Sequence, residues 1–252
     1  MMFGINFSLL MNLTMLPLCY AMIIYLTSPY GTIGIKRGFN HILGGISSVL
    51  VVMLIFLVTP DIKNDYSPFV NAFFIIGPRE ELSKLVVFLI LGRISRRKNE
   101  HPMATMFYVG MIGLGFAVVE NVQYVGMYGE SILGIRLFTA TIAHMLFGMF
   151  MGYWLAKGNL DNGLGNRSVF GVIVHRDPKI KGLIYTFIGL LAAIGYHGLW
   201  NYNLMISYSA YGDGFTDVSS NTIMIMLIVF GLVGVKFAGD DLNASYRRQL
   251  KN

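Results

Sequence analysis

The sequence predicts an all-α fold: a polytopic membrane helix bundle with about seven transmembrane helices. Of the 252 residues, 55% are hydrophobic and only 13% are charged, whereas a soluble domain carries roughly 25% charged residues. The 29 glycines suit membrane helices, in which glycine is more frequent than in soluble ones. No internal repeat or soluble domain interrupts the pattern, so residues 1–252 are expected to form one integral membrane domain.

Seven apolar stretches have the length of about 20 residues that a helix needs to cross a bilayer. The first is interpreted as a retained span, because the first basic residue is Lys36 and a signal peptide would begin with a basic region. The predicted spans are 5–27, 41–59, 70–92, 103–127, 132–156, 181–206 and 219–237.

The basic residues predict the orientation of the bundle. Most of the 19 lysines and arginines fall in the first, third and fifth connections and in the C-terminal tail, and basic loops stay in the cytoplasm. The N-terminus is therefore expected outside and the C-terminus in the cytoplasm. The net charge of +6 is explained by this topology and by attraction to anionic lipid, which argues against a nucleic-acid partner.

Several ionisable residues lie inside the predicted spans, where each charge costs about 2.5–3.5 kcal/mol and usually marks a functional site. At 1.5 Å per residue, the acids and histidines lie between the midplane and the outer leaflet, so they are expected to converge on one polar site open to the extracytoplasmic side. Arg136, near the outer end of the fifth span, is interpreted as a snorkelling anchor rather than a substrate contact. The others are Arg79, Glu80, Glu81, Lys84, Glu120, His144 and His197.

Local spacing suggests how these charges are tolerated. Pro78 should interrupt or start a helix, which would place Glu80 and Glu81 near a helix N-terminus, where anions are favoured. Glu80 and Lys84 are four residues apart and could form an ion pair that serves only packing. Glu120 has no basic residue within a helical turn, so it is either protonated or paired with another helix.

This set of side chains is typical of a hydrolase. A buried glutamate can act as general base toward water, and histidines with Asn201 can stabilise the oxyanion. Alternatively, the same types of side chain can bind zinc. No HExxH pair is present, and the sequence leaves open whether the cofactor is none or a divalent metal. The candidate metal ligands are Glu81, Glu120, His144 and His197.

Four ordered motifs on successive spans carry a family resemblance. "EELSK" at 80–84 matches EExxK, "FAVVEN" at 116–121 matches FxxxEN, and His144 and "HGLWN" at 197–201 follow. The chain resembles the PrsW family of bacterial intramembrane proteases over a catalytic core of about 70–206. That family shares a superfamily with type II CAAX prenyl endopeptidases and ABI proteins. CAAX-type members have histidine at the position of Glu120, which makes a prenylated substrate less consistent with this sequence.

The resemblance implies site-1-type cleavage of a single-pass membrane protein, such as an anti-sigma factor, near the extracytoplasmic side of a bacterial plasma membrane. It implies that Glu80 and Glu81 are catalytic acids, one of which activates water, and that Lys84 orients or neutralises them. Carried over by position, the remaining catalytic residues are Glu120, His144, His197 and Asn201, with Phe116 and Asn121 in support.

Three alternatives remain. A CAAX-like or ABI-like peptidase would act on another peptide, and a site on the cytoplasmic side would favour it. A proton-coupled transporter would use the same intramembrane residues as a relay, but the paired inverted repeats common in transporters are not evident. A non-catalytic scaffold would tolerate Glu81→Gln and His197→Ala.

Overall fold

The computed structural model describes residues 15, 17–23, 34–59, 66–95, 101–161, 178–211 and 218–251. Over these residues the chain is helical and contains no strand, which confirms the all-α prediction. Of the first predicted span, 5–27, only residues 15 and 17–23 belong to the described part, and they are helical.

The other six predicted spans each correspond to helical structure, although the ends differ. The third span is divided into three helical segments and the fifth into an α-helix preceded by two shorter segments. The last helix continues 13 residues beyond the predicted end of its span, from 237 to 250. The elements are α2 (Ile35–Val58), α3 (Pro68–Val70), η1 (Asn71–Ile76), α4 (Gly77–Ser95), α5 (Pro102–Tyr128), η2 (Glu130–Ile132), α6 (Leu133–Phe138), α7 (Ala140–Asp161), α8 (Pro178–Tyr211) and α9 (Val218–Leu250).

Five helical stretches of the described chain are long and apolar enough to cross a membrane. These stretches comprise α2, α5, η2 to α7, α8 and α9. Helix α4 does not stand out by apolar character, because its first turns contain Arg79, Glu80, Glu81 and Lys84. It nevertheless packs inside the same bundle, against α2, α5 and α8. The charges are thus enclosed by protein rather than exposed to lipid.

The helical turns change type just before Pro78. Segment η1 is a π-helix, and the Gly77 N–H donates to the carbonyl of Ala72. The expected boundary is present, because α4 begins at Gly77 where the π-helix ends. The expected free helix N-terminus is wrong, because helical turns are continuous from Pro68 to Ser95. A wider π-helical turn accommodates a proline, whose ring would clash with the carbonyl four residues earlier in a regular α-helix.

Helix α5 forms the centre of the bundle, packed between α2 and α7. Its backbone approaches α7 closely at Gly113, where a Cβ atom would lie 2.1 Å from the carbonyl oxygen of His144. No side chain larger than hydrogen fits at that distance. Gly113 thus places the backbone of His144 directly against the central helix.

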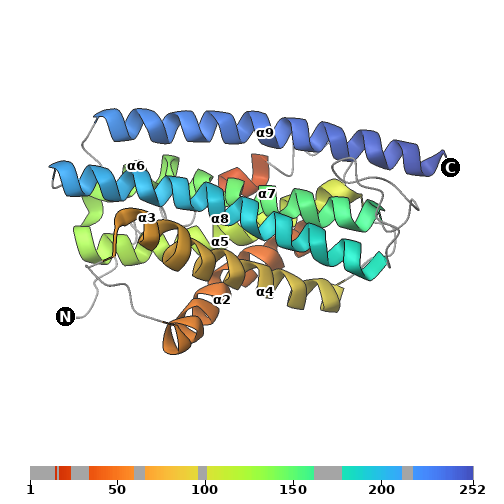
Figure 1. Cartoon of the computed structure of the whole chain (residues 1–252), viewed down its shortest axis with the longest axis horizontal. Coiled ribbons are helices and arrows are strands. Elements are labelled where there is room, and N and C mark those ends of the chain that lie inside the picture. The colour runs from red at the N-terminus through yellow and green to blue at the C-terminus, as the bar shows by residue number, and fades with distance from the viewer. Residues whose placement is uncertain are drawn as a thin grey trace.

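Helix α9 runs along one side of the bundle (Figure 1) and contacts α7, α8 and α5. Near its C-terminal end, Asp241 accepts hydrogen bonds from Lys157 and Tyr153 of α7. The ends of α4 and α9 and the beginning of α8 lie at one end of the molecule (Figure 1). That end is the cytoplasmic one in the predicted orientation.

Candidate active site

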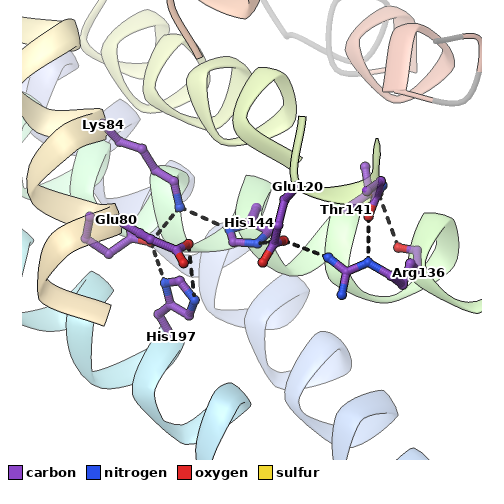
Figure 2. A network of polar contacts seen from close by, with 9 residues as sticks. Glu80, Lys84, Glu120, Arg136, Thr141, His144 and His197 are labelled. Carbon is purple, nitrogen blue, oxygen red and sulfur yellow. Dashed lines mark hydrogen bonds and ion pairs between the residues drawn. The ribbon is translucent and has the colours of Figure 1, made fainter. Parts of the chain in front are cut away.

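Four helices bring together the acids and histidines found in separate predicted spans. Glu80, Glu81 and Lys84 come from α4, Glu120 from α5, His144 from α7 and His197 from α8. Figure 2 shows one continuous polar network through these side chains. It lies in the half of the bundle that contains the C-terminal end of α5, since Glu120 is only about two helical turns from Tyr128.

Lys84 lies at the centre of this network and has no solvent exposure. Its Nζ donates to Glu81 Oε1 at 2.7 Å and to His144 Nδ1 at 3.0 Å. It also lies 4.3 Å from the centre of the Phe116 ring, a favourable position for a cation. The expected pair of Glu80 with Lys84 is therefore wrong, because the lysine takes the neighbouring carboxylate, three residues away.

The partners of His144 determine which of its nitrogens carries the proton. Lys84 can only donate, so Nδ1 must accept. On the other side, Nε2 lies 2.7 Å from Glu120 Oε2, and a carboxylate accepts the N–H. The hydrogen-bond network thus assigns the neutral Nε2–H tautomer, with the lone pair of Nδ1 directed toward the lysine.

His197 repeats this arrangement with a second carboxylate. Its Nδ1 donates to Glu81 Oε1 at 2.8 Å, and its Nε2 faces Glu80 Oε2 at 3.7 Å. That separation is too long for a direct hydrogen bond. The ring is 1% exposed, and Phe147 stacks on it with ring centroids 4.8 Å apart. A buried acceptor nitrogen and a buried carboxylate oxygen thus face each other across a short gap.

The donor atoms around this gap fit a divalent metal ion. Glu80, His144 and His197 each offer a ligand atom, and these atoms lie within 4.8 Å of one another. Glu80 Oε2 is buried without a hydrogen-bond partner among the described residues. Both histidines donate their other N–H to a carboxylate, which is the usual outer-shell arrangement of metal-binding histidines. The structure groups Glu80 with the histidines, whereas Glu81 and Glu120, two of the ligands expected from sequence, contact the histidines' N–H groups.

Glu120 is paired with residues of other helical segments, which was one of the two possibilities that the sequence left open for it. Its Oε2 accepts from Arg136 Nη2 at 2.7 Å as well as from His144. The interpretation of Arg136 as a snorkelling anchor is wrong, because the side chain is 2% exposed and points into the bundle. Sequence reasoning missed the pairing of Arg136 with Glu120, although an acid without a base on its own helix was the signal that could have found it.

Arg136 is itself held on several sides. Its Nε donates to Asn121 Oδ1 at 2.8 Å, and Asn121 Nδ2 donates to Thr141 Oγ1 at 2.9 Å. The Thr141 hydroxyl donates in turn to the backbone carbonyl of Arg136 at 3.2 Å. Tyr124 lies under the guanidinium, with its ring centre 3.6 Å away. Asn121, a supporting residue in the sequence prediction, therefore acts on the arginine.

Asn201 lies one helical turn beyond His197 on α8 and is half-buried. Among the described residues, no hydrogen bond of the network reaches it. Its role in stabilising an oxyanion stays a prediction. Ser83, the serine nearest in sequence to the glutamates, donates its hydroxyl to the backbone carbonyl of Glu80 at 2.7 Å. That bond is internal to helix α4.

Comparison with known proteins identifies a family that this chain matches. The model of the PrsW family of intramembrane metalloproteases matches residues 39–234. Protease PrsW of Oceanobacillus iheyensis is 25% identical over 200 residues, which cover 79% of this chain and 81% of the relative. Protease PrsW of Clostridioides difficile is 25% identical over 172 residues, 66% of each chain. No solved structure matches the chain.

Proposed function

Because this chain belongs to the PrsW family of intramembrane metalloproteases, we propose that its buried Glu/His cluster hydrolyses a peptide bond of a single-pass membrane protein. The observation that carries the proposal is the grouping of Glu80, His144 and His197 within 4.8 Å. A membrane protease needs such a polar site enclosed by its helices, because hydrolysis consumes water, which the bilayer core excludes.

Glu80, His144 and His197 are the side chains that would hold a zinc ion. Three protein ligands and one open position are typical of catalytic zinc, which polarises a carbonyl and acidifies bound water. The charges are compatible with a dication: the three carboxylates outnumber Lys84 and Arg136 by one. Metal binding through His144 Nδ1 would require Lys84 to give up its hydrogen bond to that nitrogen. Lys84 would keep its hydrogen bond to Glu81 Oε1.

Glu81 is proposed as the general base. Its Oε1 accepts from Lys84 and His197, while its Oε2 is buried without a hydrogen-bond partner among the described residues. The free oxygen can take a proton from water as the water oxygen bonds to the scissile carbonyl carbon. When the carbon–nitrogen bond breaks, the same proton passes to the leaving amine. Asn201 is proposed to stabilise the oxyanion formed in between.

The substrate is proposed to be cut near its extracytoplasmic side, in the manner of site-1 cleavage of a membrane-anchored anti-sigma factor. In the predicted orientation, the cluster lies toward the outer ends of α5 and α8. The enzyme is proposed to act in a bacterial plasma membrane. A short segment of the substrate would have to unwind to enter, since a helix hides its peptide bonds in internal hydrogen bonds.

The test is cleavage in proteoliposomes. The purified chain is reconstituted with a single-pass anti-sigma factor, and products are identified by mass spectrometry. We expect one cut near the extracytoplasmic membrane boundary, lost in Glu81→Gln and His197→Ala. Cleavage that persists in both variants would contradict the proposal.

His41→Ala serves as the matched control for the histidine variant. His41 is also buried, at 3% exposure, but it stacks on Tyr108 and bonds to the carbonyl of Arg37. Among the described residues, its hydrogen bond and ring contacts involve Arg37, Phe88 and Tyr108 rather than a proposed catalytic side chain. Loss of cleavage in His41→Ala to the same extent would show that the assay reports folding rather than chemistry.

A further inference from the structure

Arg136 lies outside the four motifs that identified the site, yet it is among the largest fully enclosed side chains of the described chain. A buried guanidinium is retained only where its charge and its donors are matched. Here the match is Glu120 on one side and Asn121 on the other. Neither of these partners is a member of the proposed metal-binding trio.

The contacts of Arg136 determine, through Glu120, which nitrogen of His144 carries the proton. The guanidinium cannot lose its proton in a protein, so Glu120 stays ionised beside it. An ionised Glu120 can only accept, and the hydrogen bond at 2.7 Å to His144 therefore requires a proton on Nε2. With that proton fixed, Nδ1 is the unprotonated nitrogen of His144, which accepts from Lys84 and can bind a cation once Lys84 gives up that bond.

We propose that Arg136 is a positioning residue for the reaction, which holds Glu120 so that His144 presents an unprotonated Nδ1 to the active site. The inference rests on the proposed function of the cluster, since it assigns a role within it. Asn121 accepts from the guanidinium and donates to the Thr141 hydroxyl. Thr141 in turn donates to the backbone carbonyl of Arg136, so both residues help to hold the arginine in place. A break in the helix at Thr139, between α6 and α7, separates Arg136 from His144.

Rigidity supports a positioning role over a purely electrostatic one. The side chain of Arg136 is bound through Nε and Nη2, stacked on Tyr124 and linked back to its own carbonyl. A lysine would keep the charge but would lose the planar fork that contacts Asn121 and Glu120 together. Arg136→Lys and Arg136→Gln therefore separate charge from geometry.

The first measurement is ¹⁵N NMR of the metal-free protein labelled at histidine. The chain has five histidines, and His144→Gln identifies the signal. Because Lys84 also fixes the tautomer by donating to Nδ1, the comparison is made in a Lys84→Met background. We expect the Nε2–H form of His144 in the wild type and in Lys84→Met, and a mixture of tautomers when Arg136→Gln is added. His197, whose tautomer is set by Glu81, should be unchanged in both. A wild-type Nδ1–H form, or an unaltered Nε2–H form in the Lys84→Met, Arg136→Gln double variant, would overturn the inference.

The second measurement is zinc affinity by competition with a chelator, together with the separate values of kcat and KM. Loss of an outer-shell partner weakens metal binding or activity by roughly 10–100-fold. We expect that loss in Arg136→Gln, in kcat rather than KM, with partial recovery in Arg136→Ala when guanidinium ion is added. A loss of activity that equals the unfolded fraction of each variant, with no rescue by guanidinium ion, would indicate a structural role alone.

Asp241→Asn is the matched control. It removes a carboxylate from another ion pair of α7, the one with Lys157, and should leave the tautomer and the zinc affinity unchanged. The NMR result does not depend on catalysis. If the tautomer shifts as expected but no zinc binds, the proposed metal site fails while the positioning of His144 by Arg136 stands.

Discussion

The two adjacent glutamates of the EExxK motif are expected to cause different losses of function when each is changed to glutamine. Glu80→Gln removes the carboxylate that faces His197 Nε2 at 3.7 Å and should lower zinc affinity. The loss should exceed the roughly 10–100-fold that an outer-shell change costs, because a ligand itself is replaced. Glu81→Gln should retain zinc, since Glu81 is proposed to contribute only a proton-accepting oxygen.

The loss of activity in Glu81→Gln can be estimated from its role. General base catalysis contributes typically 10²–10⁴-fold, which corresponds to about 2.7–5.4 kcal/mol of transition-state stabilisation. Glutamine can still accept from Lys84 and His197 through its amide oxygen, so much of the local geometry should be kept. We expect kcat to fall within that range while KM changes little.

The assay combines zinc content by mass spectrometry with cleavage rates in proteoliposomes for both variants. If Glu80→Gln kept its zinc and Glu81→Gln lost it, the roles assigned to the two residues would be reversed. If both retained zinc at full affinity, the proposed metal-binding set would be refuted. A Glu81→Gln enzyme with the wild-type rate would remove Glu81 as the base, whatever the metal content.

Two further predictions concern the support of the site. Lys84→Met should lower the free energy of unfolding in mixed micelles by about 3–5 kcal/mol, because Glu81 would lose its buried cation. Adding Glu81→Gln should restore part of the lost stability. A Lys84→Met variant as stable as the wild type would contradict the pairing of Lys84 with Glu81. Gly113→Ala should cost about 1–3 kcal/mol by overpacking and should reduce cleavage, since the new methyl group meets the His144 carbonyl. Gly195→Ala is its control, because a Cβ there meets nothing within 4 Å, and equal losses in the two would refute the close-approach argument.

Much of the site could be predicted from the sequence, because ionisable side chains in a bilayer have few ways to be satisfied. Glu120 had no base on its own helix, which required protonation or a partner from elsewhere in the bundle. Histidines on two other spans at similar depth made convergence the simplest solution. Depth and charge together thus indicated one polar cluster without any knowledge of the packing.

The pairing within the cluster could not be predicted in the same way. Glu80 and Glu81 lie four and three residues before Lys84, and both spacings place side chains on neighbouring parts of a helix surface. The choice of Glu81 depends on which side of α4 faces His144 and His197, which is a property of the assembled bundle. Arg136 was misjudged for a similar reason, because its position near the end of an apolar stretch fits an anchor as well as a buried partner.

Because η1 is π-helical, the number of residues in that segment determines which side chains face α8. A π-helical turn contains one residue more than an α-helical turn would need, so removal of one residue from 71–76 would tighten the segment toward α-helical turns and bring Pro78 against the carbonyl four residues before it. The upstream residues would then rotate by about 100° relative to Glu80 and Glu81. Phe73, whose ring now occupies the space that the hydrogen of Gly198 leaves open, would face a different neighbour. A one-residue gap at this place in an alignment therefore represents a change in how the outer part of the helix packs on α8, and not a harmless difference in loop length.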